Sequence, residues 1–189
     1  MAKKMKRTAL LSTLITAILV IWYGQTERGI ILTAAITFGT VSYHFVMRLF
    51  TGTVVNLLLN NRVDYRKRWF RVSAFEEKLY KKLNVKKWKG KMETYDPDCF
   101  DRQKHSWDEI AQAMCQAEVV HELIIVLSFL PVFAAIPFGA LPVFVITSVL
   151  AACFDAMFVI MQRYNRPRII KLIESSERNR AKRGSACLR

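Results

Sequence analysis

Residues 119–161 read VVHELIIVLSFLPVFAAIPFGALPVFVITSVLAACFDAMFVIM, an almost wholly apolar stretch interrupted at its midpoint by PFGALP, residues 137–142. Proline and glycine at that point end one helix and allow another to begin. At about 1.5 Å per residue, each half can cross, or nearly cross, a hydrocarbon layer of roughly 30 Å. The stretch therefore predicts a transmembrane helical hairpin.

A second hairpin is predicted near the N-terminus. Apolar runs at residues 8–23 and from 29 to about 50 are separated by the polar sequence QTER. The chain starts with basic residues, as a signal peptide does, but no small-residue cleavage site follows the first run, so we interpret it as a retained membrane helix. The predicted fold class is an all-α integral membrane protein with four transmembrane helices in two hairpins and a cytosolic helical segment between them.

Four segments are expected to form one domain. They are an N-terminal membrane hairpin (1–60), a basic cytosolic segment (61–117), a C-terminal membrane hairpin (118–161) and a basic cytosolic tail (162–189). Within the cytosolic segment, Ser73 with Glu76 and Ser106 with Glu109 have the spacing of capping boxes, which mark helix starts. The helix opened by Ser106 meets no breaker before Pro131, so we expect it to continue into the membrane.

The charge distribution predicts the orientation. The 189 residues are 52% hydrophobic, yet Lys and Arg number 29 against 15 acidic residues, a net charge of +14. This composition excludes a disordered chain and argues against a soluble basic domain. Four basic residues precede the first apolar run, fourteen lie between Arg62 and Lys104, and nine follow Met161. By the positive-inside rule, we expect a multi-pass protein of the cell membrane with both termini in the cytoplasm.

The basic residues also suggest partners. Anionic lipid head groups attract such segments, so membrane lipids are the expected partners, and no nucleic-acid-binding motif is visible. The four cysteines form no CxxC pair and predict neither disulfides nor a thiolate metal cage. The three histidines, His44, His105 and His121, are too far apart in sequence to suggest a zinc site. The sequence leaves the oligomeric state open.

Candidate chemistry lies on the helix opened by Ser106. Its residues Trp107, Ile110, Met114, Ala117 and His121 recur at helical spacing, and Glu118 lies three positions before His121. Ionisable groups at membrane depth tend to face a protein interior or a wet cavity. One interpretation is a general base, His121, with Glu118 as its orienting carboxylate. The other is that Glu118, His121 and Glu122 are interface residues at the cytosolic end of the helix.

Further polar residues are expected at the same depth. His44 and Arg48 lie near the cytosolic end of the second apolar run, and Asp155 lies in the cytosolic half of the fourth. Because the outer halves of all four helices are apolar, this asymmetry predicts a polar pocket that opens to the inner leaflet rather than a pore. For Asp155, a structural pairing with Arg48 or Arg163 stands beside a catalytic role.

Two segments carry a resemblance to a known family. They are KKWKGK at residues 86–91 and QRYNRPR at residues 162–168, with AEVVH at 117–121 and Pro131 between them. In this order they resemble the glycosyl-4,4'-diaponeurosporenoate acyltransferases, over about residues 68–170. The resemblance implies a membrane enzyme that moves a fatty acyl chain onto a sugar hydroxyl of a lipid-linked glycoside, a carotenoid glycoside or a related glycolipid, at the inner leaflet. The first two helices show no such similarity.

Such a transfer requires an activated hydroxyl, a stabilised oxyanion and a bound thioester donor. We expect His121 to accept the hydroxyl proton and Glu118 to fix its tautomer. The donor is expected to be acyl-CoA or another acyl thioester, with no resident cofactor and no metal. Its phosphates, or alternatively lipid head groups, would contact Lys87, Lys89, Arg163, Arg166 and Arg168. The remaining candidate substrate-binding residues are Trp88, Tyr164, Asn165, His44 and Arg48, of which Trp88 and Tyr164 can stack on a ring or anchor at the interface.

Two non-enzymatic alternatives remain open at the level of sequence. The cationic cytosolic face and the absence of a complete catalytic signature also fit a membrane scaffold or lipid-binding protein of a lipid-biosynthesis complex. A small transporter is the weaker alternative, because four short helices without polar outer halves leave little room for alternating access.

Overall fold

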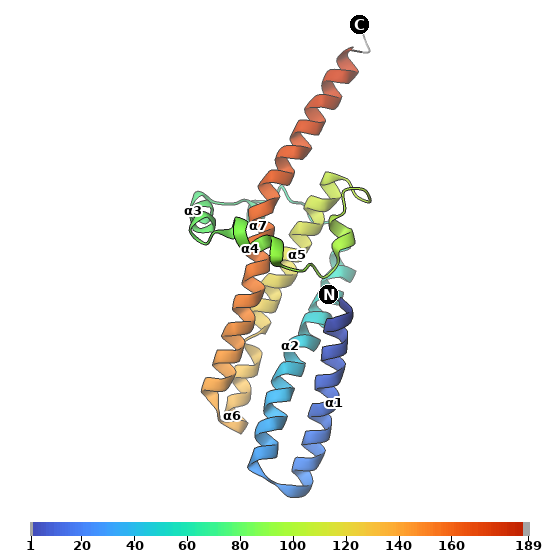
Figure 1. Cartoon of the computed structure of the whole chain (residues 1–189). Helices are drawn as coiled ribbons and strands as arrows, with labels where there is room; N and C mark the ends of the chain where they lie inside the picture. The colour runs from blue at the N-terminus through green and yellow to red at the C-terminus, as the bar shows by residue number, and fades with distance from the viewer. Residues whose placement is uncertain (1, 187–189) are drawn as a thin grey trace. The chain divides into compact units, whose positions relative to one another are not determined.

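The computed structural model describes residues 2–186, with side chains described for residues 2–180. All regular structure within these residues is helical (Figure 1). The elements in chain order are α1 (Ala2–Thr26), α2 (Gly29–Leu59), η1 (Arg68–Phe70), α3 (Ala74–Lys82), α4 (Val85–Trp88), η2 (Lys89–Lys91), η3 (Pro97–Phe100), α5 (Trp107–Leu127), η4 (Leu130–Ala134), α6 (Ala135–Phe138) and α7 (Leu141–Ala186). The predicted all-α fold class is confirmed.

Four helical stretches are long and apolar enough to cross a membrane, as the sequence predicts. They are Ala2–Thr26, Gly29–Leu59, Trp107–Phe138 and Leu141–Arg180. Helices α1 and α2 are longer than their apolar runs, because the flanking Lys, Arg, Leu and Val residues continue the helix without a breaker. The described chain divides into two compact units. The first unit comprises the residues up to Leu57 and Val120–Ala156, and the second comprises Leu58–Val119 and the residues from Met157 onward.

In the first unit, α1 and α2 form an antiparallel hairpin (Figure 1). The hydroxyls of Thr13 and Ser42 are hydrogen-bonded across the hairpin at 2.6 Å. Gly39 approaches Thr16 closely enough that an added Cβ would contact its methyl group at 3.5 Å. Small residues and hydroxyl groups at the contact allow the two backbones to pack closely, which is the usual way that helices associate in lipid.

The second hairpin of the first unit turns where the sequence predicts. Helix α5 ends at Leu127, shortly before Pro131, whose missing N–H and ring prevent the α-helix from continuing. After α6, Gly139 has φ +69° and ψ −148°, and Ala140 has φ +53°. These two left-handed residues reverse the chain before α7 begins at Leu141.

The second unit has its own core. Buried apolar side chains from the segment after α2, from α5 and from α7 pack together: Val63, Tyr65, Phe70, Ala111, Cys115 and Ile173. At two helix starts the predicted capping boxes are present. The backbone N–H of Glu76 donates to Ser73 Oγ at 3.2 Å, and that of Glu109 donates to Ser106 Oγ, also at 3.2 Å. In both cases the glutamate side chain accepts from the N–H of the serine, so these starts are fixed by local sequence.

Helix α7 is 46 residues long and continues to Ala186. Residues 162–186, which the sequence suggests are a tail, are therefore helical. Pro167 lies within this helix, where it withholds one backbone hydrogen bond without ending the helix. Cys99, Cys115 and Cys153 are free thiols, whereas Cys187 lies outside the described residues.

Gly139 provides a test of the hairpin turn. Its combination of φ and ψ is essentially restricted to glycine. An added Cβ would have nothing within 4 Å, so the cost of Gly139→Ala is backbone strain rather than a clash. We expect this variant to lower the free energy of unfolding by about 1–3 kcal/mol, measured as a lower thermal midpoint in detergent.

Gly24→Ala is the matched control, because Gly24 lies in α1 and an added Cβ there also has nothing within 4 Å. Alanine is the better helix former, so the midpoint of this variant should stay level or rise slightly. Equal midpoints for Gly139→Ala and Gly24→Ala would contradict the assigned turn geometry.

Candidate functional site

A polar cluster in the first unit is centred on Asp155 of α7. The side chain of Asp155 is 1% exposed, and its Oδ1 lies 2.9 Å from Nδ1 of His121 on α5. The guanidinium of Arg48 on α2 donates to the other oxygen, Oδ2. Because a carboxylate at Nδ1 favours the tautomer with its proton on that nitrogen, Nε2 is the basic nitrogen of the His121 ring in that tautomer. The cluster thus has the geometry of a general base with an orienting carboxylate.

Arg48 is held by more than Asp155. Its guanidinium also donates to the carbonyl of His44 at 3.0 Å and to the carbonyl of Ala151 at 3.4 Å. These contacts fix the cation against the buried carboxylate. Arg48 therefore balances the charge of Asp155, as one of the two sequence interpretations of Asp155 predicted, and its capacity to bind a substrate anion is correspondingly small.

His44 lies next to this cluster in the first unit. It is buried, and neither ring nitrogen has a hydrogen-bond partner within the described part of the chain. Its ring meets that of Tyr43 edge-on, with the centroids 5.5 Å apart. Since a buried polar group without a partner costs free energy, the His44 ring is a candidate contact for a polar atom of a ligand.

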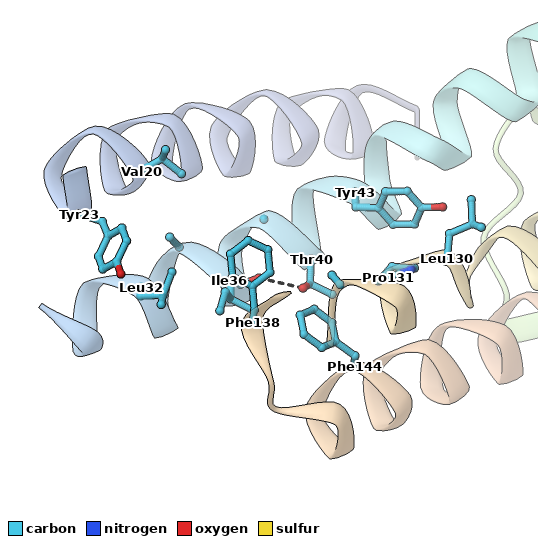
Figure 2. Close-up of a pocket in the computed structure, with 13 residues that line it drawn as sticks. Val20, Tyr23, Leu32, Ile36, Thr40, Tyr43, Leu130, Pro131, Phe138 and Phe144 are labelled. Atoms are coloured by element: carbon cyan, nitrogen blue, oxygen red, sulfur yellow. Dashed lines mark hydrogen bonds between the residues drawn. The ribbon is translucent and has the colours of Figure 1, made fainter. Parts of the chain in front are cut away.

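A half-open apolar pocket of about 450 Å³ also lies in the first unit (Figure 2). Its walls come from α1, α2, η4, α6 and α7, and they include Ile36, Phe138 and Phe144. Tyr43 lines the pocket and is the immediate neighbour of His44. The lining of the pocket on α2 therefore ends at Tyr43, five residues before Arg48 of the polar cluster.

The second unit buries a different carboxylate, Glu118 of α5. Its side chain is fully buried; Oε1 accepts from Arg163 at 2.6 Å, and Oε2 accepts from Arg166. Arg166 is itself fully buried, 3.3 Å from Sγ of Cys115 and with its guanidinium 5.0 Å from the centre of the Phe70 ring. Removing one partner of such a buried pair typically costs about 3–5 kcal/mol, so this group is structural.

Arg163 also connects α7 to the segment around α3. It donates to Glu76 at 2.6 Å and to the carbonyl oxygens of Trp69 and Arg71 at 3.2 Å and 3.1 Å. Burial by itself raises the pKa of Glu76, but hydrogen bonds from Arg163, Ser73 and Tyr80 outweigh it and lower this pKa to about 2. Burial and the hydrogen bond to Glu76 raise the pKa of Tyr80 to about 12.

The two segments that carry the resemblance meet in the second unit. Nζ of Lys89 donates to Oδ1 of Asn165 and lies 4.9 Å from the centre of the Tyr164 ring. The guanidinium of Arg168 lies at the same distance from that ring and donates to its hydroxyl at 3.1 Å. No ion pair joins Lys89 or Arg168 to a carboxylate among the described side chains. We call Lys89, Tyr164, Asn165 and Arg168 the cationic cluster.

Among the side chains that the structure describes, no carboxylate forms an ion pair with this cluster. Burial, followed by the nearby charges of Arg168 and Lys86, lowers the pKa of Lys89. Like charges held close together without an acidic partner bind an anion favourably. The cationic cluster is therefore a candidate phosphate-binding surface.

The predicted site residues thus separate into groups. His121, Arg48 and His44 gather in the first unit, and Lys89, Tyr164, Asn165 and Arg168 form the cationic cluster. Arg163 and Arg166 are neutralised by glutamates, Lys87 is exposed, and Trp88 donates its indole N–H to the carbonyl of Leu83 at 3.1 Å. The side chains of Arg163, Arg166 and Trp88 therefore already have partners within the protein.

One predicted role needs correction. The carboxylate at Nδ1 of His121 is that of Asp155, whereas both oxygens of Glu118 accept from arginines. The sequence suggested Glu118 because it lies three positions from His121, but the geometry assigns the orienting role to a residue on another helix. The sequence predicts the capping role of Glu76, which depends only on Ser73 three residues earlier. It does not predict the contacts of Glu76 with Arg163 and Tyr80. Among the described residues, no group of three or more His, Cys, Asp or Glu side chains is placed to hold a metal ion.

Comparison with known proteins gives one match. The model of the glycosyl-4,4'-diaponeurosporenoate acyltransferase family matches residues 66–175. This range includes His121, Asp155 and the whole cationic cluster, whereas Arg48 and His44 lie before it. Searches of curated proteins and of solved structures gave no match.

The lowered pKa of Glu76 predicts a pH dependence of stability. A carboxylate whose pKa falls from 4.5 to about 2 on folding stabilises the folded chain fully above about pH 5, and this contribution is lost as the pH falls towards 2. We expect Glu76→Gln to lower the thermal midpoint relative to wild type at pH 7, and the difference to narrow between pH 5 and pH 3.

Glu77→Gln is the control, because Glu77 is the exposed neighbour in the same helical turn. Its midpoint should differ little from that of wild type at each pH. A difference between Glu76→Gln and wild type that stays constant from pH 7 to pH 3 would refute the ion pair between Glu76 and Arg163.

Proposed function

Because the chain belongs to the glycosyl-4,4'-diaponeurosporenoate acyltransferase family, we propose that it transfers a fatty acyl chain from a thioester donor to a sugar hydroxyl of a carotenoid glycoside or a related glycolipid. The observation that carries this proposal is the hydrogen bond between His121 Nδ1 and Asp155 Oδ1, 2.9 Å long and in the same unit as an apolar pocket. This arrangement combines a base for a hydroxyl group with space for a hydrocarbon chain.

The chemistry follows from the His121–Asp155 pair. Nε2 of His121 accepts the proton of the sugar hydroxyl as its oxygen attacks the thioester carbonyl. The resulting imidazolium is stabilised by Asp155 through Nδ1, as in other histidine–carboxylate pairs. When the tetrahedral oxyanion collapses, the C–S bond breaks, and the leaving thiolate takes the proton from His121. The products are the ester and a free thiol, and the enzyme returns to its starting protonation state.

Arg48 keeps Asp155 in the form that this chemistry needs. An isolated charged carboxylate in an apolar helical bundle would cost several kcal/mol. With Arg48 on one oxygen and His121 on the other, the carboxylate remains an acceptor for the Nδ1 proton. In this proposal Arg48 is a positioning residue, and the catalytic residue is His121.

The donor head group is proposed to bind at the cationic cluster. An acyl-CoA or a comparable thioester carries phosphates, for which Lys89 and Arg168 supply charge and the Tyr164 ring supplies a flat surface. The basic residues between the two hairpins and after the last span support a cytoplasmic position for this surface, for both termini and for the reaction at the inner leaflet of the cell membrane.

Loss of the base should abolish transfer. We expect His121→Ala to lower the rate of glycolipid acylation by about 100-fold or more, and Asp155→Asn to lower it substantially as well. The measurement is lipid mass spectrometry of membranes supplied with labelled fatty acid and containing wild type, a variant or no protein.

His105→Ala is the control, because His105 lies outside both clusters and pairs only loosely with Glu109, at 3.8 Å. This variant should keep wild-type activity. Full activity of an inserted His121→Ala protein would remove His121 from the mechanism. If wild-type membranes match protein-free membranes while acceptor glycolipids are present, the acyltransferase proposal fails.

The cationic cluster should affect donor binding rather than the chemical step. We expect Lys89→Met and Arg168→Met each to raise the KM for acyl-CoA by about 5–20-fold, because one charge-assisted contact is worth about 1.5–3 kcal/mol before exposure to solvent weakens it. Steady-state kinetics at fixed acceptor concentration measures this effect, with kcat close to that of wild type. Lys87→Met removes an exposed charge outside the cluster and is the matched control. An unchanged KM in both cluster variants would place donor binding elsewhere.

A further inference from the structure

The apolar pocket of the first unit has a function that the acyl-transfer chemistry leaves unassigned. Three of its lining residues carry hydroxyl groups, and two of these are already bonded within the protein. Thr40 donates to the carbonyl of Ile36 at 2.8 Å, as Figure 2 shows, and Tyr43 donates to the carbonyl of Leu127 at 2.8 Å. A ligand rich in hydroxyls would lose its hydrogen bonds in such a pocket. The walls therefore select hydrocarbon.

The length of the pocket suits a long unbranched chain. Its lining on α2 extends from Leu32 to Tyr43, a distance of about 17 Å at about 1.5 Å per residue. With C–C bonds of about 1.5 Å, an extended alkyl chain advances roughly 1.3 Å per carbon. The pocket thus has room for an alkyl chain of about thirteen carbons.

Polar residues lie beyond one end of the pocket. Tyr43 lies at this end, and its ring contacts the buried ring of His44, whose two nitrogens have no partner in the described part of the chain. One helical turn further along α2, Arg48 contacts Asp155, which in turn holds His121. A chain lying in the pocket with its carbonyl at the Tyr43 end would present that carbonyl to the polar cluster.

We propose that this pocket binds the hydrocarbon chain of the acyl donor and that its depth limits the length of the chain transferred. The inference rests on the proposed acyl transfer. The donor chain fits better than the hydrocarbon of the acceptor, because the carbonyl that is attacked belongs to the donor and must reach the polar cluster beyond the Tyr43 end. In this assignment the chain passes Ala134 and Phe138, two lining residues of which Phe138 lies beside Ile36 of α2 (Figure 2).

The test alters the depth of the pocket in both directions. Ala134→Phe fills about 3.5–4 Å, the thickness of one ring in contact, which equals about three carbons. Phe138→Ala enlarges the pocket beside Ile36. Membranes with each variant receive a mixture of labelled acyl-CoA chain lengths together with acceptor glycolipid, and mass spectrometry gives the chain-length distribution of the product. We expect the distribution to shift by about three carbons towards shorter chains for Ala134→Phe and towards longer chains for Phe138→Ala.

Two matched controls make the same side-chain changes outside the pocket. Ala135→Phe adds a ring at the neighbouring residue, and Phe133→Ala removes one that is 68% exposed; neither residue lines the pocket. Both controls should keep the wild-type distribution. If Ala134→Phe fails to fold, Phe138→Ala decides the matter alone. An unchanged distribution in active pocket variants would overturn the pocket assignment and leave the acyl transfer intact.

A binding measurement separates the two proposals. A photoreactive fatty acyl-CoA is cross-linked to the purified protein, and the labelled peptides are mapped. Labelling of residues 130–144 by a long-chain probe that is weaker in Ala134→Phe than in Ala135→Phe supports the pocket, even if wild type shows no transfer and the proposed function has failed. Labelling elsewhere, or preferential labelling of this stretch by a photoreactive carotenoid glycoside, would overturn the assignment.

Discussion

A carboxylate that is buried among helices must be paired with a cation, because an unpaired charge in an apolar interior costs several kcal/mol. Each of the two units contains one such carboxylate. Asp155 is 1% exposed and Glu118 is fully buried, and arginines contact both. This constraint decides which cations are available to a ligand. Three of the arginines that look like anion-binding residues in the sequence are already occupied within the protein.

The two buried carboxylates differ in their hydrogen-bond partners. Each oxygen of Glu118 accepts from an arginine. One oxygen of Asp155 is bonded to a histidine whose side chain is 21% exposed. The imidazole of this histidine can act as a general base, which an arginine side chain does not do. The family match covers both Asp155 and His121, whereas Arg48, which balances their charge, comes from α2 outside the matched range.

Features encoded locally were predictable from the sequence. The four spans follow from apolar runs, the helix starts at Ser73 and Ser106 follow from a serine and a glutamate three residues apart, and the hairpin turn follows from Gly139. The partners of the ionisable residues were not predictable in the same way. Spacing along one helix suggested Glu118 for His121, but the actual partner lies 34 residues away on α7. Periodicity shows which residues share a face of a helix and gives no register between helices.

The contact between Lys89 and Asn165 joins two segments that are 76 residues apart in sequence. Tyr164 and Arg168 on α7 take part in the same group of contacts, so the short KKWKGK segment and QRYNRPR depend on each other structurally. If parts are exchanged between this chain and another member of the family, the two segments must be exchanged together. A chimera that takes one segment without the other would separate side chains that contact one another, whereas a crossover point before residue 86 or after residue 168 would keep them together.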